Sequence, residues 1–247
     1  WTFAPDTDAA DSVKTFTVEQ GSTERAHRFP HGLVTGLELM FSRSGCEISG
    51  GEMIGAALED NVAMTAAPTA IELVPVIPTQ VDVYLADSQA GLAGATALSR
   101  AISAGWKLND RFGPVFPLAT QFGTGFATTV EIEPAGQCSL KMEADAEGMA
   151  LLSTLRQGAT KFMRIAATGG LIEGTEYYTL QIDTALKVED VAEFSDEDGL
   201  FAIEWTFSWV HDATWGKATM NASSSTITSI TGQSRLRPEN RRLPTCM

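Results

Sequence analysis

The sequence predicts a mainly β fold with one α-helix. Hydrophobic and polar residues alternate in several short stretches, which is typical of strands that bury one face. The clearest of these stretches is residues 200–209, LFAIEWTFSW. Only one segment, residues 145–158, combines helical spacing of hydrophobic residues with start and stop signals. With 247 residues and a hydrophobic fraction of 44%, the chain can form a sizeable core in one large β domain or in two small ones.

The N-terminal third is expected to contain an arm, a hairpin and a long loop. Residues 1–12 are polar and acidic with one proline, and they predict an extended arm. Residues 34–48 predict a hairpin with its turn at Ser44–Gly45. Three side chains of this hairpin share the apolar face: Leu37, Leu39 and Phe41. Residues 50–79, rich in Ala, Thr and Pro, predict a long extended loop, in which a short helix is possible over residues 53–58.

Four strands are expected in the middle of the chain, at residues 81–85, 98–108, 124–133 and 139–143. The second has one apolar face, formed by Leu98, Ile102, Ala104, Trp106 and Leu108. The third has a face formed by Phe126, Thr128, Val130 and Ile132. We therefore expect the third strand to pair with the second.

The single helix has recognisable ends. Asp145 can cap its N-terminus, Arg156 suits its last turn, and Gly158 can end it. The apolar stripe between these ends consists of Met149, Leu152 and Leu155. The pattern predicts one amphipathic helix that packs on a sheet.

Three strands follow the helix: residues 162–166, 178–188 and 201–209. The last two are expected to pair, since each has a long run of period two. On the last strand one face is strongly apolar, with Phe201, Ile203, Trp205, Phe207 and Trp209. This face is the strongest prediction of a core in the sequence.

Six carboxylates lie directly before the last strand: Glu189, Asp190, Glu193, Asp196, Glu197 and Asp198. With a turn at Asp198–Gly199, they occupy the tip of a hairpin. An EF-hand loop would need acids where Phe194 and Trp205 stand, so the sequence does not fit an EF-hand calcium loop. A glycosidase pair would lie in a cleft lined by aromatic residues, whereas these aromatic residues belong to the core face. We expect a solvated, mutually repulsive acidic tip.

Catalytic, metal and cofactor sites are not predicted. The motifs GxSxG, HExxH, GxxxxGK[ST] and GxGxxG are absent. Cys46, Cys138 and Cys246 are far apart in the sequence, and the histidines do not add a ligand set, although His27 and His31 are four residues apart. We expect a protein that is not an enzyme, with reduced thiols.

Charge limits the possible partners. The net charge of −14 disfavours sequence-reading contact with nucleic acid, although it allows a polyanion to be repelled. No run of residues reaches the length of a membrane span. The C-terminal tail, residues 218–247, is rich in Ser and Thr and then becomes basic, with Arg235, Arg237, Arg241 and Arg242. Such a tail suits docking on an acidic neighbour, for example another copy of this chain.

The order of several short blocks resembles the major tail tube proteins of long, flexible-tailed bacteriophages of actinobacterial hosts. The blocks are FTVEQG (16–21), LELMFSRSG (37–45), ISGG (48–51), KLNDRFGP (107–114), VEIEP (130–134), EADAEGM (143–149), LRQG (155–158), FMRI (162–165), and a last group running from Ile182-Asp183 through FSDEDG (194–199) to IEW (203–205). The resemblance covers residues 13–217 and leaves out the arm and the tail.

The resemblance implies a β-sandwich with one flanking helix, whose inner sheet joins a multi-subunit β-barrel. It implies homo-hexameric rings that stack into a tube, through which double-stranded DNA passes as non-specific cargo. The expected partners are further copies and other tail proteins, namely tape measure, tail terminator and distal tail protein. The expected location is the virion, after assembly in the host cytoplasm. A membrane is not among the expected partners.

If the long hairpins form the inner barrel, Glu38, Asp183 and Glu204 are the candidate lumen-facing acids, since each opposes the apolar face of its strand. The loop at residues 50–79 is the candidate contact between stacked rings. Three alternatives stay open: a carbohydrate-binding or adhesin-like β-sandwich, a secreted tube protein of the haemolysin-coregulated kind, and an acidic β-fold hydrolase. The first would expose aromatic residues, and the last would need a catalytic arrangement that the sequence lacks.

Overall fold

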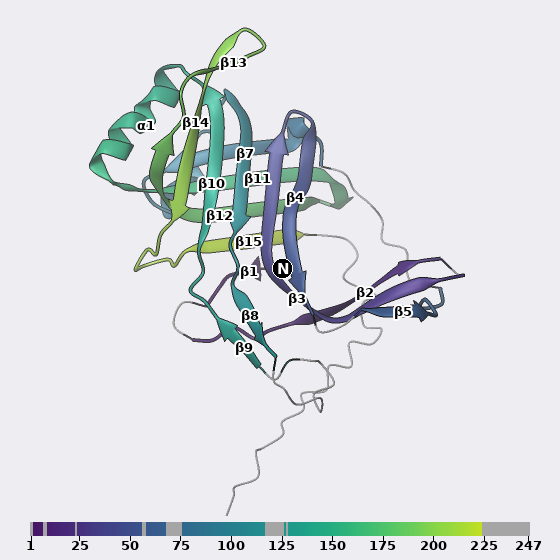
Figure 1. Ribbon diagram of the computed structural model, residues 1–247. Coiled ribbons are helices and arrows are strands. Elements are labelled where there is room, and N and C mark those ends of the chain that lie inside the picture. Colours follow the sequence, from purple (N-terminus) through teal and green to yellow (C-terminus); the bar gives the residue numbers. More distant parts are fainter. Residues whose placement is uncertain are drawn as a thin grey trace, which may run out of the picture.

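The structure is a computed structural model, and it describes residues 2–6, 9–22, 24–55, 58–67, 76–116, 126 and 128–223 (Figure 1). Within these ranges the chain is mainly β with one α-helix, and its strand pairs are antiparallel, as the sequence predicts. The four arginines of the predicted basic tail lie outside the described residues. The same holds for residues 68–75 of the predicted loop.

One layer of the fold consists of five adjacent strands. Their order is β4 (Gly45–Ile54), β3 (Ala26–Ser42), β7 (Ala101–Leu108), β10 (Gly136–Glu143) and β14 (Leu200–Trp209). They are the upright strands of Figure 1. Residues 43–44 form the turn between β3 and β4, since Ser42 lies opposite Gly45. The turn therefore begins one residue earlier than predicted.

The second layer consists of β6 (Val81–Ala86), β11 (Thr160–Glu173), β12 (Glu176–Val191), β15 (Ala218–Ser223) and β1 (Thr2–Phe3). These strands run across the first set in Figure 1. β12 joins the layers, because β15 pairs with its first half and β14 pairs with its end. The predicted pairing of residues 178–188 with residues 201–209 is confirmed.

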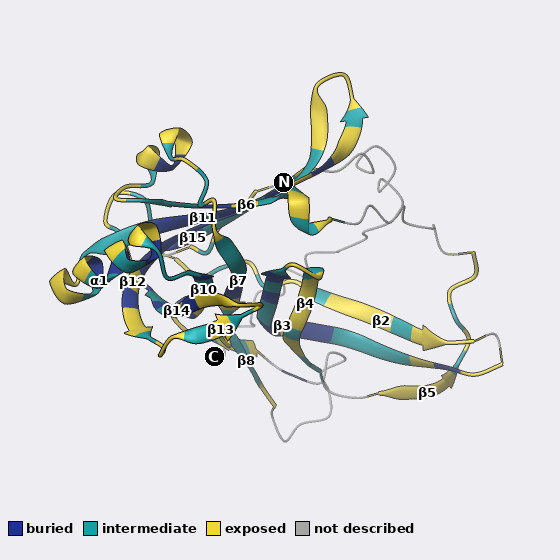
Figure 2. Cartoon of the chain, turned by 90° about the horizontal axis from the view of Figure 1, so that it is seen from above, coloured by how far each residue is buried: buried dark blue, intermediate teal, exposed yellow. Residues whose placement is uncertain are grey.

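A single large core lies between the layers. Leu140, Trp205 and Phe207 come from the first layer and are 0% exposed, while Ile165 and Ile182 come from the second and are 1% exposed. Burying one such side chain contributes about 1.5–3 kcal/mol. A hydrogen bond also crosses the core, where Trp106 Nε1 donates to Thr184 Oγ1 at 3.1 Å. In Figure 2 the buried residues accordingly follow the inner strands.

Phe201 was predicted to face the core, and this prediction is wrong. It is 72% exposed, although it alternates in step with the buried residues of β14. The strand runs past the edge of the core, where β13 (Ser195–Glu197) becomes its partner. Alternation shows which face of a strand is apolar, but it does not show how far along the strand the core covers that face.

The helix α1 (Ala146–Gln157) has the predicted ends. The Asp145 side chain accepts a hydrogen bond from the Gly148 backbone N–H, and Gly158 takes the left-handed conformation with φ of 62°. The deepest residues are Gly148, Leu151 and Thr154. The predicted stripe of Met149, Leu152 and Leu155 is only partly buried, although it also packs against the core. The helix thus lies rotated relative to the prediction.

A ribbon of strands projects from the two layers (Figures 1 and 2). It consists of β2 (Thr15–Gly21), the first part of β3 and β5 (Glu59–Val62). We call it the projecting arm. His31 has φ of 53° at the point where β3 leaves the layer for the arm. For a residue with a side chain this is an uncommon conformation, which marks a local bend in the strand.

The predicted loop at residues 50–79 is partly wrong. Residues 50–54 continue β4, and β5 follows after residue 58, so the possible helix at residues 53–58 does not begin at Met53. The short 3-10 helix η1 (Pro78–Gln80) ends the segment, and η2 (Ala90–Gly94) follows β6. The glycines of residues 50–54 lower the strand propensity of this segment, but its pairing with β3 keeps it extended.

The predicted partner of residues 124–133 is also wrong. β9 (Thr128–Glu131) pairs with β8 (Phe112–Val115) in a separate two-stranded sheet. β7 instead lies between β3 and β10. Val130 and Ile132 are 56% and 53% exposed, so their shared apolar face is not a core face. A short alternating run specifies a strand, and only the tertiary fold selects its neighbour.

Candidate assembly surfaces

The first layer has a polar outer face. Across neighbouring strands Glu38 lies opposite Lys107, Lys107 opposite Gln137, and Lys141 opposite Glu204. Opposed residues of an antiparallel pair point to the same side, and residues 137, 139 and 141 alternate with buried neighbours. These side chains therefore share one face, which we call the polar face. The other face of the same strands forms the core.

Glu38 and Glu204, two of the three predicted lumen-facing acids, lie on the polar face. Glu38 pairs with Lys107 at 3.6 Å, with its side chain 37% exposed. Glu204 is exposed beside Lys141, which itself pairs with Glu197. The face therefore alternates acids with lysines that already have carboxylate partners.

Asp183, the third predicted acid, is not a solvent-facing charge. It is 2% exposed and forms a two-pronged ion pair with Arg164, at 2.7 Å to Nε and 2.8 Å to Nη2. The hydrogen bond to Asp183 raises the pKa of Arg164. Asp183 lies on β12, and its side chain points away from the core, which its neighbour Ile182 faces. The sequence predicts this orientation, but the side chain is covered and its charge is neutralised.

β4 forms one border of the first layer. Among the described residues its ladder partner is β3, along a strand of 10 residues. Its other side presents backbone donors and acceptors that can pair with a further strand. Ile48, on this strand, is 72% exposed. The border is thus a long strand edge with an apolar side chain beside it.

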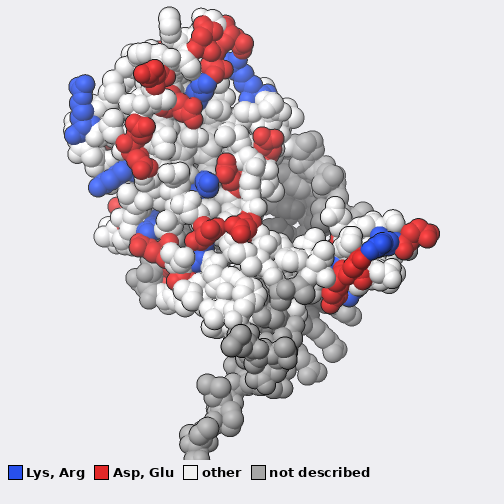
Figure 3. Space-filling model, viewed as in Figure 1, with Lys and Arg blue, Asp and Glu red and all other residues white. Residues whose placement is uncertain are grey.

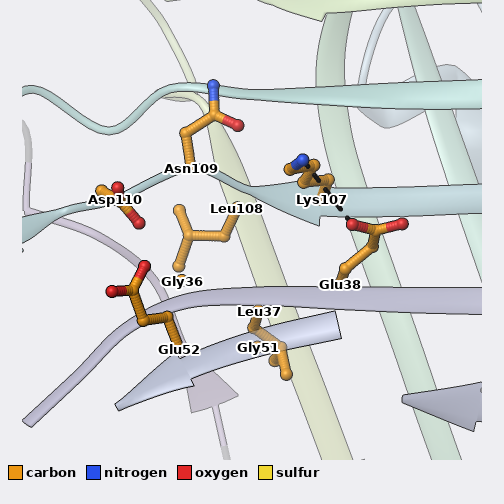
Figure 4. Close-up of a pocket in the computed structure, with 9 residues that line it drawn as sticks. All are labelled: Gly36, Leu37, Glu38, Gly51, Glu52, Lys107, Leu108, Asn109 and Asp110. Carbon is orange, nitrogen blue, oxygen red and sulfur yellow. Dashed lines mark ion pairs between the residues drawn. The ribbon is translucent and has the colours of Figure 1, made fainter. Parts of the chain in front are cut away.

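A shallow groove of about 420 Å³ lies where β3, β4 and the end of β7 meet (Figure 4). Register shifts between β3 and β4 lie on both sides of residues 36–38, which line this groove. The carboxylates of Glu52 and Asp110 lie on its two sides, and Lys107 reaches Glu38. No described His, Cys, Asp and Glu residues gather in a group that could hold a metal ion. The groove is a polar surface feature at the end of the polar face.

The acidic tip is partly neutralised by neighbours. β13 and β14 form a hairpin that was not predicted, although its turn is the predicted one, with Asp198 and Gly199 at φ of 56° and 86°. Asp198 pairs with Arg43 at 2.8 Å, and Glu197 pairs with Lys141. Glu189 and Asp190 lie within β12, with Asp190 opposite Thr206 in the middle of β14, so the prediction that they belong to the tip is wrong. Figure 3 shows acidic side chains gathered at the end of the molecule that holds β13. These ion pairs to the β3–β4 turn and to β10 neutralise two of the acids, so the tip is less repulsive than the sequence predicts.

Three apolar side chains stand beside these acids. Phe194, Leu200 and Phe201 are 60%, 43% and 72% exposed. By contrast Trp106, Trp205 and Trp209 are buried. The tip therefore combines apolar and acidic chemistry, which suits a partner with apolar and basic residues.

Two buried cations were not predicted. Arg111 is 4% exposed and pairs with Asp11 at 2.6 Å and with Glu131. Lys217 is 8% exposed, donates to the Pro134 carbonyl at 2.8 Å and pairs with Glu133. Both line a second cleft of about 420 Å³ between residues 131–134 and the turn before β15. A lone basic residue within a polar stretch gives no sequence sign that it is buried.

The chain matches no protein-family model, and no curated protein matches it. Among solved structures it is similar to the SPP1 tail tube, determined as a hybrid structure by solid-state NMR and cryo-EM. The two are 13% identical, with a TM-score of 0.38, and the match covers 65% of this chain and 88% of the other. Similarity at this level assigns neither a fold nor a function to this chain. None of the helices in the described residues is long and apolar enough to cross a membrane.

Proposed function

We propose that this chain is a structural subunit of a bacteriophage tail tube, which assembles with itself into stacked hexameric rings. One observation carries the proposal: a sheet with one core face and one polar face ends at β4, which pairs on one side only among the described residues. A sheet of this kind can continue from subunit to subunit and close into a barrel with a polar interior. The order of short blocks that resembles major tail tube proteins supports the same assembly.

The edge of β4 is the proposed junction between neighbours in a ring. Each backbone hydrogen bond to a neighbouring strand contributes about 0.5–1.5 kcal/mol, so a 10-residue edge supplies a substantial contact. The contact is heterologous, because it joins an edge to a different surface of the next copy. Repetition of a heterologous contact closes a ring when the rotation fits.

The polar face is the proposed lining of the channel, with Glu38 and Glu204 facing the DNA. Lys107 and Lys141 lie among these acids, but each is already paired with a carboxylate. Paired lysines are poor ligands for phosphate, so the duplex can pass without being held. Asp183 is not part of this lining, since its charge is buried against Arg164.

The remaining surfaces are proposed contacts along the tube and at its ends. The segment at residues 50–79, which includes β5, is the proposed contact between stacked rings. The basic tail of one copy, with its four arginines, is proposed to dock on the acidic and apolar tip of another. Tape measure, tail terminator and distal tail proteins are the proposed partners at the lumen and the tube ends. The protein would then act in the virion, after assembly in the host cytoplasm.

Electron microscopy of the purified chain, with light scattering after size exclusion, tests the proposal. Hollow tubes or six-membered rings are expected, either from the chain alone or after addition of the other tail proteins of its virion. A strictly monomeric particle under both conditions would overturn the proposal. A deletion at the tip of residues 50–79 should leave rings or monomers, and tubes of normal length would contradict its role between rings.

A further inference from the structure

The N-terminal segment connects the second layer to the β8–β9 hairpin. We call its described residues, 2–6 and 9–12, the strap. At one end Thr2 lies opposite Asn221 and Phe3 opposite Met220, so β1 covers part of the outer edge of β15. The Thr2 hydroxyl also donates to Asn221 Oδ1 at 2.7 Å. This end of the strap is held as a short added strand.

The other end of the strap is held by a buried guanidinium group. Arg111 Nη2 donates to the Asp11 carboxylate at 2.6 Å and to the Asp6 carbonyl at 3.3 Å. Its Nη1 donates to the Ile132 carbonyl at 2.8 Å, and the Asp11 backbone N–H donates to Glu131 at 3.0 Å. We call Arg111, Glu131 and the Ile132 carbonyl the cradle. The strap supplies the cradle with a carboxylate and a carbonyl oxygen.

An empty cradle would be unfavourable. With the strap in place Arg111 is 4% exposed, and without the strap it would lose the Asp11 carboxylate and the Asp6 carbonyl and keep Glu131 as its carboxylate partner. A buried charge that loses a partner is strongly destabilising. The strap can therefore leave its cradle at low cost only when an equivalent segment takes its place. A second copy of this chain carries such a segment.

The strap is also placed to reach a second copy. Residues 13 and 14 join it to β2, and an extended chain from residue 12 to residue 15 spans about 10 Å. β2 belongs to the projecting arm, which points away from the two layers (Figure 2). Exchange therefore requires a neighbour on this arm whose β15 and cradle lie within that reach of β2.

We propose that the strap is exchanged between copies on assembly, so that it pairs with β15 and fills the Arg111 cradle of the next subunit. The inference rests on the proposed function, which supplies the second copy. Each contact made within one chain is made again between chains, so exchange needs no new chemistry and links the subunits in series.

A disulfide test distinguishes the two arrangements. Thr2→Cys and Asn221→Cys are placed together in a chain that also carries Cys46→Ser and Cys246→Ser. After oxidation, unassembled protein should give only the monomer mass on a non-reducing denaturing gel. Assembled material should give a ladder of covalent multimers. Phe3→Cys with Met220→Cys repeats the test at the neighbouring pair, in case the first pair is not tolerated.

The control pair is Thr168→Cys with Thr179→Cys, which lie opposite each other on β11 and β12 within one layer. It should give the monomer mass in both states. Assembled tubes that give only the monomer mass with both strap pairs would overturn the exchange and leave the tail tube proposal standing. Failure to assemble, seen by microscopy with all tail proteins present, would overturn the tail tube proposal and the exchange with it.

Discussion

At the scale of single residues, alternation in the sequence shows which side of a strand a charged residue is on, but not whether that residue is buried. Asp183 follows Ile182 and therefore lies on the side of β12 away from the core, as its position in the sequence predicts. The face of a strand that points away from the core is not always exposed to solvent. Here Arg164 and Asp183 form a covered pair, so the aspartate belongs to the stability of the fold and not to a charged lining.

Asp183→Ala should lower the free energy of unfolding by about 3 kcal/mol, because it leaves Arg164 with a poorly compensated charge. Glu204→Gln is the matched control on the exposed polar face, and it should change the free energy by less than about 0.5 kcal/mol. Urea unfolding followed by circular dichroism measures both variants. Equal stability of the two variants would return Asp183 to the list of exposed acids.

Acid should destabilise the fold through four carboxyl groups whose pKa is lowered by a hydrogen-bonded partner: Glu19 by Thr65, Asp60 by Arg25, Glu133 by Lys217 and Asp212 by Thr214. A lowered pKa in the folded state means that folding favours the charged form. The resulting stability is present above the unfolded pKa, about 4, and is lost as the pH falls through the folded pKa.

The contribution of these groups to the melting temperature should therefore be constant from pH 7 to 5 and should fall below about pH 4. Thermal melts across this range give the measurement. Asp60→Asn should show a smaller fall than the unchanged chain, because one of the titrating groups is gone. A melting temperature that rises below pH 4 would contradict the sign of this argument.

At the scale of the elements, β4 shows how neighbouring strands override local preference. Its sequence GCEISGGEMI contains three glycines, and its second half lay within the predicted loop. Pairing with β3 keeps it extended to Ile54 nonetheless. The result is a long border strand with Ile48 exposed beside it.

Ile48→Lys should block assembly while leaving the subunit folded. A lysine on an edge strand opposes the approach of another strand, and an exposed position tolerates it within about 0.5 kcal/mol. Sedimentation of assembled material and a thermal melt measure the two effects. Leu171→Lys, at a position 55% exposed on β11, is the control for an added surface charge. If both variants assemble like the unchanged chain, the edge of β4 is not the junction.

The helix α1 provides a second test at this scale. Asp145→Ala removes the acceptor for the Gly148 N–H, at 2.9 Å, and should cost about 1 kcal/mol. Chemical unfolding measures the loss. Asp145→Asn keeps a side-chain oxygen and should retain most of the stability. A loss of the same size in both variants would mean that the ion pair with Arg100, at 3.7 Å, and not the cap, is what Asp145 contributes.

At the scale of the whole molecule, the distribution of charge matters more than its sum. The net charge is −14, yet the polar face mixes acids with lysines, and acids gather at the β13–β14 tip and on the projecting arm (Figure 3). On that arm they meet Arg25 and Arg28 in ion pairs. The lysines of the polar face are also paired.

The assembled chain should therefore show no measurable affinity for double-stranded DNA, even at low salt. Filter binding or fluorescence anisotropy at about 50 mM salt gives the measurement. Glu38→Gln with Glu204→Gln should leave assembly intact and permit weak binding that disappears with added salt, because Lys107 loses its partner. Binding by the unchanged chain that weakens steeply with salt would contradict a non-adhesive lining.

The sequence by itself determined the strands with strong alternation, the helix with its Asp145 cap and Gly158 end, and the turn at Asp198–Gly199. These features depend on interactions between residues close together in the sequence, so the sequence itself is enough to predict them. The same rules placed Glu38 and Glu204 on the polar side of their strands. Only the tertiary structure decided that β9 pairs with β8, that Phe201 lies beyond the core, and that Arg111, Asp183 and Lys217 are buried. Those outcomes depend on which distant segments cover a side chain or complete a strand's hydrogen bonds, and a sequence pattern carries no direct record of such neighbours.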